Sequence, residues 1–421
     1  MKTVWARYGG WAVFFALFAS LAVLHFAGRI NLTTADVGRH LKNGELFLKH
    51  HQVLFTNFYS YTSPDFPAIC HHWLSGVFFY WIFERIGFGG LGLFYVGLLL
   101  ATFFLFIAAS ARASRLSWAV LAGVIALPLA AYRLEIRPEG ISTFFLAVYF
   151  FLLNEYRLKR LDSRWLFAIP VLQMLWVNAH IFFFIGFFLT VCFAWDAFLN
   201  EGASGRFKAL FFVALATAAA SFVNPFIFSG ATLPVNIFQS YGYDLAENQN
   251  IFFMIKRFPG EKVYYYFLAV LALGAAALFF QSLAQKSWRK MLLPFLMYLF
   301  FSLVAINTVR AIAMFAFFFI LSFGESGYGA LKAWVPGLKE KVSLWIGRVC
   351  VFTVCLGLVC PYFYLSPLKK FFTFIPAGKA QLKGSYFYVL SHPGIWTGLL
   401  PEVNSSAEFW KKTGMKGPLA L

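Results

Sequence analysis

The chain has 421 residues, of which 61% are hydrophobic, 21% aromatic and only 12% charged. A soluble domain carries about 25% charged residues and could not bury this much apolar surface, so the composition excludes a soluble enzyme and predicts a protein solvated by lipid. The formal net charge of +18 would suggest a nucleic-acid partner in a soluble protein. In a membrane protein such a charge is typical of basic cytoplasmic loops and of contact with anionic membrane lipid, and we expect no nucleic-acid partner.

Apolar runs near membrane-spanning length recur along the chain. A transmembrane helix needs roughly 20 mostly apolar residues, with about 17 as the lower end. We therefore predict an all-α, polytopic integral membrane protein with about 11 transmembrane helices in one module over residues 1–364. The predicted spans are, in chain order, 10–28, 91–110, 118–132, 139–153, 165–179, 181–199, 208–223, 263–281, 291–306, 308–323 and 343–364.

Short basic loops predict the orientation of these spans, because cytoplasmic loops carry an excess of Lys and Arg. All of them lie on one side only if residues 73–87, a short stretch that contains Glu84 and Arg85, form an amphipathic helix along the outer interface instead of a span. We thus expect a cytoplasmic N-terminus and an extracytoplasmic C-terminus. The basic loops are the N-terminus with Lys2 and Arg7, 111–117, 154–164, 200–208, 282–290 and 324–342.

This orientation leaves three long outer segments, the first outer loop 29–90, the outer loop 224–262 and the short C-terminal segment 365–421. Unusual polar residues gather in these segments and at the outer ends of the spans. Each alone also fits a structural role, such as a solvated helix cap, a headgroup anchor or a packing residue. Together they predict a site, because ionisable groups at this depth are costly unless they serve one. The residues are Asp36, His40, His72, Arg133, Arg137, Glu139, Asn178, His180 and Arg310.

The residue types suit a lipid phosphate substrate. Arginine binds phosphate oxygens bidentately and stabilises charge on a phosphate leaving group, which is the role we expect for Arg133, Arg137 and Arg310. A carboxylate near an acceptor hydroxyl acts as a general base. Asp36 begins a helix-like stretch, 35–50, and we expect it to share a helix face with His40, four residues later. The pattern favours transfer of a group from a lipid phosphate or diphosphate.

In their order along the chain, several motifs resemble the GT-C superfamily of polytopic membrane glycosyltransferases, which includes protein mannosyltransferases and the aminoarabinose transferases of lipid A. The resemblance is nearest to bacterial members and covers most of the chain. The motifs are Asp36-Val-Gly-Arg-His40-Leu41-Lys-Asn-Gly44, Tyr61-Thr62-Ser-Pro64, His72-Trp73-Leu74, Arg137-Pro138-Glu139, Trp176-Val-Asn178-Ala-His180 and Asn224-Pro225.

The resemblance implies a polyprenyl-phosphate sugar donor, a glycan, lipid or protein acceptor, and an inverting displacement on the extracytoplasmic face. It implies a catalytic carboxylate in the first outer loop, at Asp36, and a sugar site shaped by residues such as His40, His72, Asn178 and His180. Some members require a divalent metal, for which His40 and His72 are candidate ligands. Asp36 has no acidic neighbour at the next two positions, so the cofactor stays open.

Similar proteins continue into a longer outer C-terminal segment, and residues 401–418 resemble its start. A shortened natural member and a truncated reading frame are both compatible with this. Two other functions also stay open. A lipid-linked-sugar transporter or flippase would carry charged residues at mid-bilayer in several spans, whereas a non-catalytic envelope-assembly protein would bind lipid without turnover.

Overall fold

The computed structural model describes residues 16–27, 36–236, 246–285 and 287–335, and single positions between 345 and 356. Within these ranges the chain forms α-helices and short 3-10 helices and no strand, which confirms the predicted all-α class. The predicted span 343–364 lies largely outside the described residues, and the segment 365–421 lies wholly outside them.

Helices occupy every predicted span between residues 91 and 323. Short 3-10 helices lead into several of them: η1 (Ser163–Phe167), η2 (Ile181–Phe183), η3 (Ala246–Asn248) and η4 (Val309–Ala311). Following an apolar helix at Ala16–Phe26, the α-helices are α2 (Val37–His50), α3 (Trp73–Ala113), α4 (Leu116–Ala130), α5 (Pro138–Arg157), α6 (Ala168–Ala179), α7 (Phe184–Glu201), α8 (Gly205–Ala220), α9 (Ile227–Asn236), α10 (Ile251–Arg257), α11 (Lys262–Ala284), α12 (Trp288–Asn307) and α13 (Ile312–Trp334).

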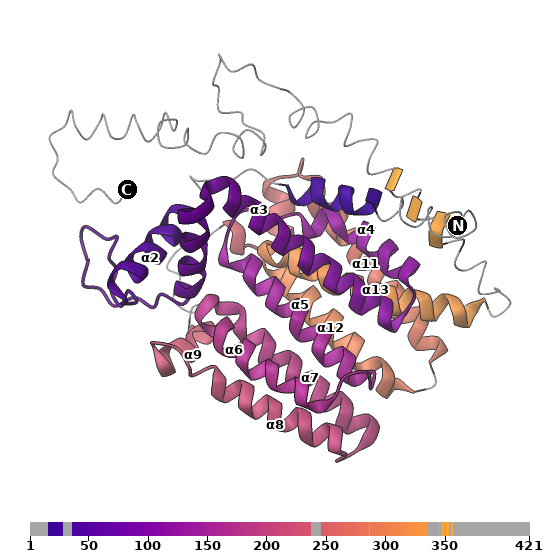
Figure 1. Cartoon of the computed structure of the whole chain (residues 1–421). Helices are drawn as coiled ribbons and strands as arrows, with labels where there is room; N and C mark the ends of the chain where they lie inside the picture. Colours follow the sequence, from indigo (N-terminus) through magenta and orange to yellow (C-terminus); the bar gives the residue numbers. More distant parts are fainter. Residues whose placement is uncertain are drawn as a thin grey trace, which may run out of the picture.

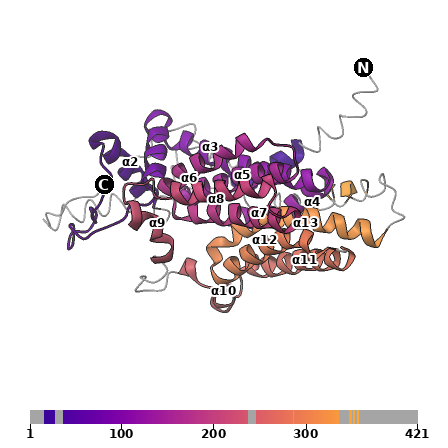
Figure 2. The same ribbon diagram turned by 90° about the horizontal axis from the view of Figure 1, so that it is seen from below.

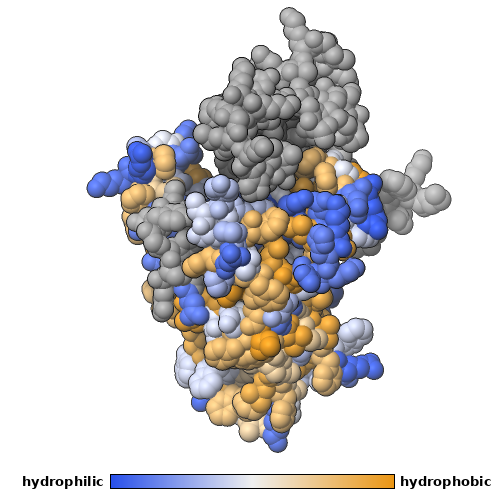
Figure 3. Space-filling model, turned by 90° about the vertical axis from the view of Figure 1, so that its left-hand side faces the viewer, coloured by the Kyte–Doolittle hydropathy of each residue, from blue (hydrophilic) through white to orange (hydrophobic). Residues whose placement is uncertain are grey.

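Among the described residues, five helical segments are long and apolar enough to cross a membrane: Trp73–Ala113, Ile181–Glu201, Lys262–Ala284, Trp288–Asn307 and Val309–Trp334. Large apolar side chains face outward on the bundle, and hydrophobic residues cover most of its lower body in Figure 3. Such a surface is stable in contact with lipid tails and not in contact with water. The chain is therefore a multi-pass α-helical membrane protein.

Gly87 divides α3 into two parts. Its φ of 65° and ψ of −170° are not helical, and only glycine adopts this region without strain. The first part lies beside α2 and the second runs along the bundle (Figures 1 and 2). The predicted separation of a short helix at 73–87 from the span that follows is confirmed at this glycine.

Glycines also bring α2 against the first part of α3. A Cβ atom added at Gly44 would lie 2.1 Å from the backbone oxygen of Gly76, so the two helices meet backbone to backbone. A side chain on either glycine would hold the helices apart. The close crossing places His40 of α2 against His72, the residue just before α3.

Buried aromatic side chains form the centre of the bundle around α13. Phe318 stacks on Phe301 of α12 at 3.6 Å between ring centroids, and Phe317 stacks on Phe106 of α3 at 5.1 Å. α13 also packs against α4 and α11, while α5 packs against α3 and α7. This packing holds the beginnings of α5 and α13 at the same end of the bundle.

Candidate functional site

Five charged residues from separate segments converge at that end, and we call them the arginine–glutamate cluster: Arg133, Arg137, Glu139, Glu247 and Arg310. The turn between α4 and α5 supplies the first two, because a proline at the first position of α5 ends the turn and starts the helix. The first turn of α5 supplies Glu139. Glu247 comes from η3, and Arg310 from η4 just before α13.

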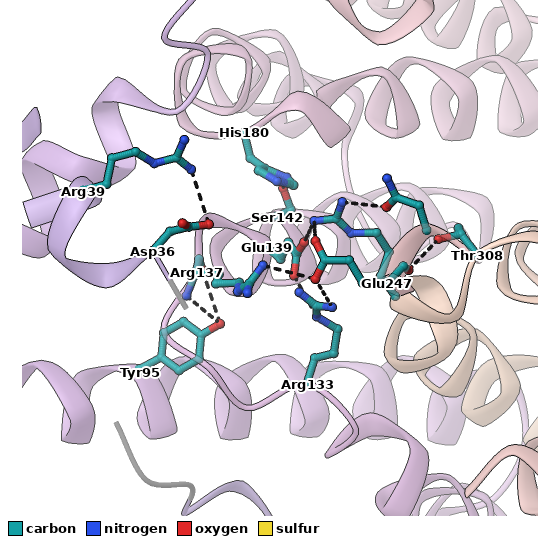
Figure 4. Close-up of polar contacts among 12 residues, drawn as sticks. Asp36, Arg39, Tyr95, Arg133, Arg137, Glu139, Ser142, His180, Glu247 and Thr308 are labelled. Atoms are coloured by element: carbon teal, nitrogen blue, oxygen red, sulfur yellow. Dashed lines mark hydrogen bonds and ion pairs between the residues drawn. The ribbon is translucent and has the colours of Figure 1, made fainter. Parts of the chain in front are cut away.

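Every member of the cluster has an ion-pair partner within it. Arg133 lies with Nε 3.2 Å from Glu139 Oε2 and donates from Nη1 to Glu247 Oε2 at 3.0 Å. Arg137 donates to the same oxygen of Glu247 at 3.4 Å. Arg310 donates to Glu139 and lies 3.6 Å from Glu247 Oε1. Figure 4 shows Arg133 and Arg137 directed toward the two carboxylates.

The cluster is mostly buried. The side chains of Arg133, Arg137 and Glu139 are 13%, 14% and 15% exposed, against 30% for Glu247. Burial alone would lower the pKa of Arg133, but the neighbouring carboxylates outweigh it and raise this pKa above its ordinary value. Glu135 of the same turn adds a further carboxylate near Arg133. Arg133 therefore stays charged in a site with little water.

Backbone contacts hold η3 against η4. Thr308 donates from Oγ1 to the backbone oxygen of Glu247 at 3.2 Å, and the backbone N–H of Val309 donates to the oxygen of Gln249 at 3.1 Å. Arg310 donates from Nη1 to Asn248 Oδ1 at 3.1 Å. None of these contacts uses the carboxylate of Glu247.

Four histidines lie next to the cluster: His40, His71, His72 and His180. The rings of His40 and His72 meet edge to face at 4.7 Å, and His71 lies 4.6 Å from His72 and 6.4 Å from His180. Burial lowers the pKa of His40 to about 3 and that of His71 to about 4, and places the pKa of His72 well below its usual value. These three imidazoles are therefore neutral at neutral pH.

His180 and Asn178, at the end of α6, have different surroundings. His180 Nδ1 lies 2.8 Å from Ser142 Oγ, which also accepts from Nε1 of the buried Trp176. Asn178 accepts from Trp73 at 2.9 Å and donates to the backbone oxygens of two other residues. Asn178 therefore ties α6 to its neighbours and makes no contact with the arginine–glutamate cluster among the hydrogen bonds of the described residues.

Asp36 lies on the α2 side of the cluster (Figure 4). It caps the start of α2 with a left-handed φ of 56°, so the predicted helix is present and begins one residue later, at Val37. Its carboxylate lies 3.4 Å from Arg39 Nη2 and is 51% exposed, whereas His40 is 3% exposed. Asp36 and His40 therefore do not share a helix face as expected, since the carboxylate is exposed and the imidazole is buried.

The described residues contain no group of three or more His, Cys, Asp or Glu side chains placed to hold a metal ion. His40 and His72, the candidate ligands, pack ring against ring instead. The donor set offers no basis for assigning a metal to these histidines.

Sequence reasoning left Glu247, Ser142 and Arg39 out of the candidate site. Glu247 lies in an outer loop without a recognisable motif. Only its ion pairs with three arginines indicate that it belongs to the candidate site. Ser142 lies in an apolar helix, four residues after Pro138, where a serine carries no signal by itself. The only signal in the sequence near Glu247 is the run of three amide residues that follows it, 248–250.

A scan against models of known protein families and a search of curated protein sequences both find no match to this chain.

Proposed function

We propose that the chain is a membrane glycosyltransferase of the GT-C type, which moves a sugar from a polyprenyl-phosphate donor to a glycan, lipid or protein acceptor on the extracytoplasmic face. The convergence of Arg133, Arg137 and Arg310 in one buried cluster is the observation that supports this most directly. Arginine is the side chain best suited to bind phosphate bidentately, and such a cluster at the end of a membrane bundle is within reach of a lipid headgroup.

In the proposed reaction Asp36 takes the proton of the acceptor hydroxyl as its oxygen bonds to the anomeric carbon of the sugar. The bond from that carbon to the phosphate oxygen breaks on the opposite face, so the configuration inverts. The bonding electrons leave with the polyprenyl phosphate, and the arginines stabilise its growing negative charge. The half-exposed position of Asp36 beside the buried cluster suits a base that meets an acceptor from outside.

The neutral histidines would form the sugar-binding part of the site. An uncharged imidazole offers one donor and one acceptor to sugar hydroxyls and adds no positive charge. His40 Nδ1 is buried without a hydrogen-bond partner among the described residues, so it has capacity for a ligand hydroxyl. His72 lies against His40, and His180 lies 6.4 Å from His71, the neighbour of His72.

The proposal includes a topology of eleven spans in a bacterial inner membrane, with the arginine–glutamate cluster outside. Single cysteines at the exposed Asp65 and Glu261 would report one end of the bundle, and cysteines at the exposed Arg164 and Lys208 the other. An impermeant maleimide should label the first pair on intact cells and the second pair only after permeabilisation. Labelling of the two pairs in the reverse order would exclude an extracytoplasmic site.

The catalytic test compares Asp36→Asn with Asp65→Asn, an exposed carboxylate of the same outer loop. Both proteins would be purified, placed in liposomes and supplied with a panel of radiolabelled polyprenyl-phosphate sugars. We expect Asp36→Asn to lose transfer by at least about 100-fold while donor binding persists, because a general base contributes 10²–10⁴-fold. Substantial residual transfer would refute the role of Asp36. Donor movement across the bilayer without transfer would favour the flippase, and binding without either would favour the non-catalytic protein.

A further inference from the structure

Glu247 holds the central position among the three arginines. It is the only described residue that makes ion pairs with Arg133, Arg137 and Arg310 together. We propose that its carboxylate is an internal competitor for the phosphate site: it pairs with the arginines when the site is empty, and the phosphate group of the donor displaces it. This inference rests on the proposed function and adds a specificity-determining residue to it.

The chemistry of the two anions supports an exchange. Carboxylate and phosphate oxygens accept the same charge-assisted hydrogen bonds from guanidinium groups. Among the ion-paired groups, three arginines face two glutamates, so the cluster carries one net positive charge with Glu247 in place and two without it. The donor phosphodiester carries one negative charge, and the leaving monophosphate carries nearly two. Arginines that Glu247 has released therefore balance the charge of the leaving monophosphate better than arginines that are still paired with it.

Glu247 is better placed than Glu139 to leave the cluster. Glu139 is fixed in the first turn of α5 and is half as exposed, at 15% against 30%. The η3 segment is held by the Thr308 and Val309 contacts to backbone oxygens, which do not involve the side chain of Glu247. The carboxylate can therefore rotate away while the loop stays docked.

The cluster also has donors that Glu247 does not use. Nη2 of Arg133 and Nε of Arg310 are buried without a hydrogen-bond partner among the described residues. A buried donor without a partner destabilises the empty site. A phosphate group presents more acceptor oxygens than a carboxylate, so it can satisfy donors that remain unmatched when Glu247 occupies the site.

The test measures binding and needs no sugar. The probe is a short-chain polyprenyl monophosphate, titrated by calorimetry into the full chain in nanodiscs of neutral lipid. Glu247→Gln should bind it at least about tenfold more tightly than the unmodified chain, because removing a competitor raises the binding-competent fraction. Glu261→Gln is the matched control, an exposed glutamate outside the cluster, and should not change the affinity. Equal or weaker binding by a folded Glu247→Gln protein would overturn the proposal.

Inorganic diphosphate distinguishes the two sources of the anion. A gain in affinity for diphosphate as well as for the lipid would assign the site to the phosphate group itself. A gain confined to the polyprenyl monophosphate would assign it to the lipid-linked form. A gain for neither probe would overturn the proposal.

A second measurement uses the unmodified chain and does not depend on the folding of a variant. A water-soluble carbodiimide with an added amine modifies free carboxylates, and mass spectrometry locates the product. The polyprenyl monophosphate should increase modification of Glu247 and leave Glu261 unchanged. Unchanged or reduced modification of Glu247 at saturating ligand would contradict displacement.

The outcomes separate this inference from the proposed function. If phosphate displaces Glu247 but no sugar is transferred to any acceptor, the anion site is supported and the glycosyltransferase function is refuted. If the protein transfers sugar but Glu247→Gln does not change the affinity for phosphate, the glycosyltransferase function is supported and the role of Glu247 as a competitor is refuted.

Discussion

The charged side chains at the two ends of α5 differ in how deeply they are buried and in how they pair. Glu139 and Glu155 are separated by about 24 Å along the helix, at 1.5 Å per residue. Around Glu139 three arginines converge on two carboxylates, and the side chains are at most 30% exposed. Around Glu155, Arg112 lies 3.9 Å away and Arg160 3.8 Å away, with exposures of 52% and 44%.

The remaining charges at the Glu155 end form separate pairs. Arg157 lies 3.6 Å from Glu325 of α13, and Arg206 pairs with Glu201 while it donates to the backbone oxygens of α5. An excess of basic residues at one end of a bundle is what membrane orientation requires. Their number therefore says little about function. At the Glu139 end three mostly buried arginines share two carboxylates, whereas at the other end only Arg112 and Arg160, both about half exposed, share Glu155. This buried convergence is what supports the proposed site.

The largest expected effect comes from removing Glu139. Its carboxylate pairs with both Arg133 and Arg310, so Glu139→Gln leaves two buried guanidiniums without it. Breaking a buried ion pair lowers the free energy of unfolding by roughly 3–5 kcal/mol. Losing a more exposed pair lowers it by about 1 kcal/mol or less. The control, Asp162→Asn, removes the partner of Arg164 just beyond the other end of α5, where the two side chains are 61% and 78% exposed. Thermal unfolding in detergent measures both, and equal losses would contradict the contrast between the two ends.

A smaller effect is expected from Gly44→Ala, which tests how α2 is held beside the cluster. The added methyl group would lie 2.1 Å from the Gly76 oxygen, so α2 must move, at a cost of about 1–3 kcal/mol. The movement should separate His40 from His72 and reduce sugar transfer. The control is Gly38→Ala in the same helix, where the new methyl group meets nothing within 4 Å. A decrease in stability of the same size in both variants would refute the close crossing.

The smallest expected effect is a change in how stability depends on pH. It should come from the buried histidines at the Glu139 end of α5. The folded pKa of His40 is about 3, below the unfolded value of 6.5, so the unfolded chain binds more protons between these values. Stability therefore falls as the pH drops below about 6.5, by roughly 1–2 kcal/mol at pH 5 for one such group. His40→Gln should reduce the fall in melting temperature between pH 7 and 5 by the share of one group, since His71 and His72 still contribute, whereas His50→Gln, at an exposed position, should not change it. An unchanged slope in His40→Gln would contradict a buried neutral imidazole.

Periodicity and composition predicted the helices but not the partners of their polar residues. Arg133, Arg137 and Arg310 were recognisable because arginine at a helix end interrupts an apolar pattern. Glu247 gave only a weak signal, because a single glutamate in an outer loop resembles any solvated residue. Asn178 stood out for the same reason as the arginines, yet its hydrogen bonds tie helices together.

The sequence by itself determined that this protein is helical, crosses the membrane several times and breaks its third helix at Gly87. These properties follow from local composition, since lipid solvates apolar runs and glycine tolerates positive φ. Only the tertiary structure decided that Glu247 faces three arginines from other segments, that Arg310 pairs with Glu139, and that His40 packs on His72. Such contacts join residues up to 171 positions apart, from Glu139 to Arg310, and are set by how the helices pack, which local sequence does not encode.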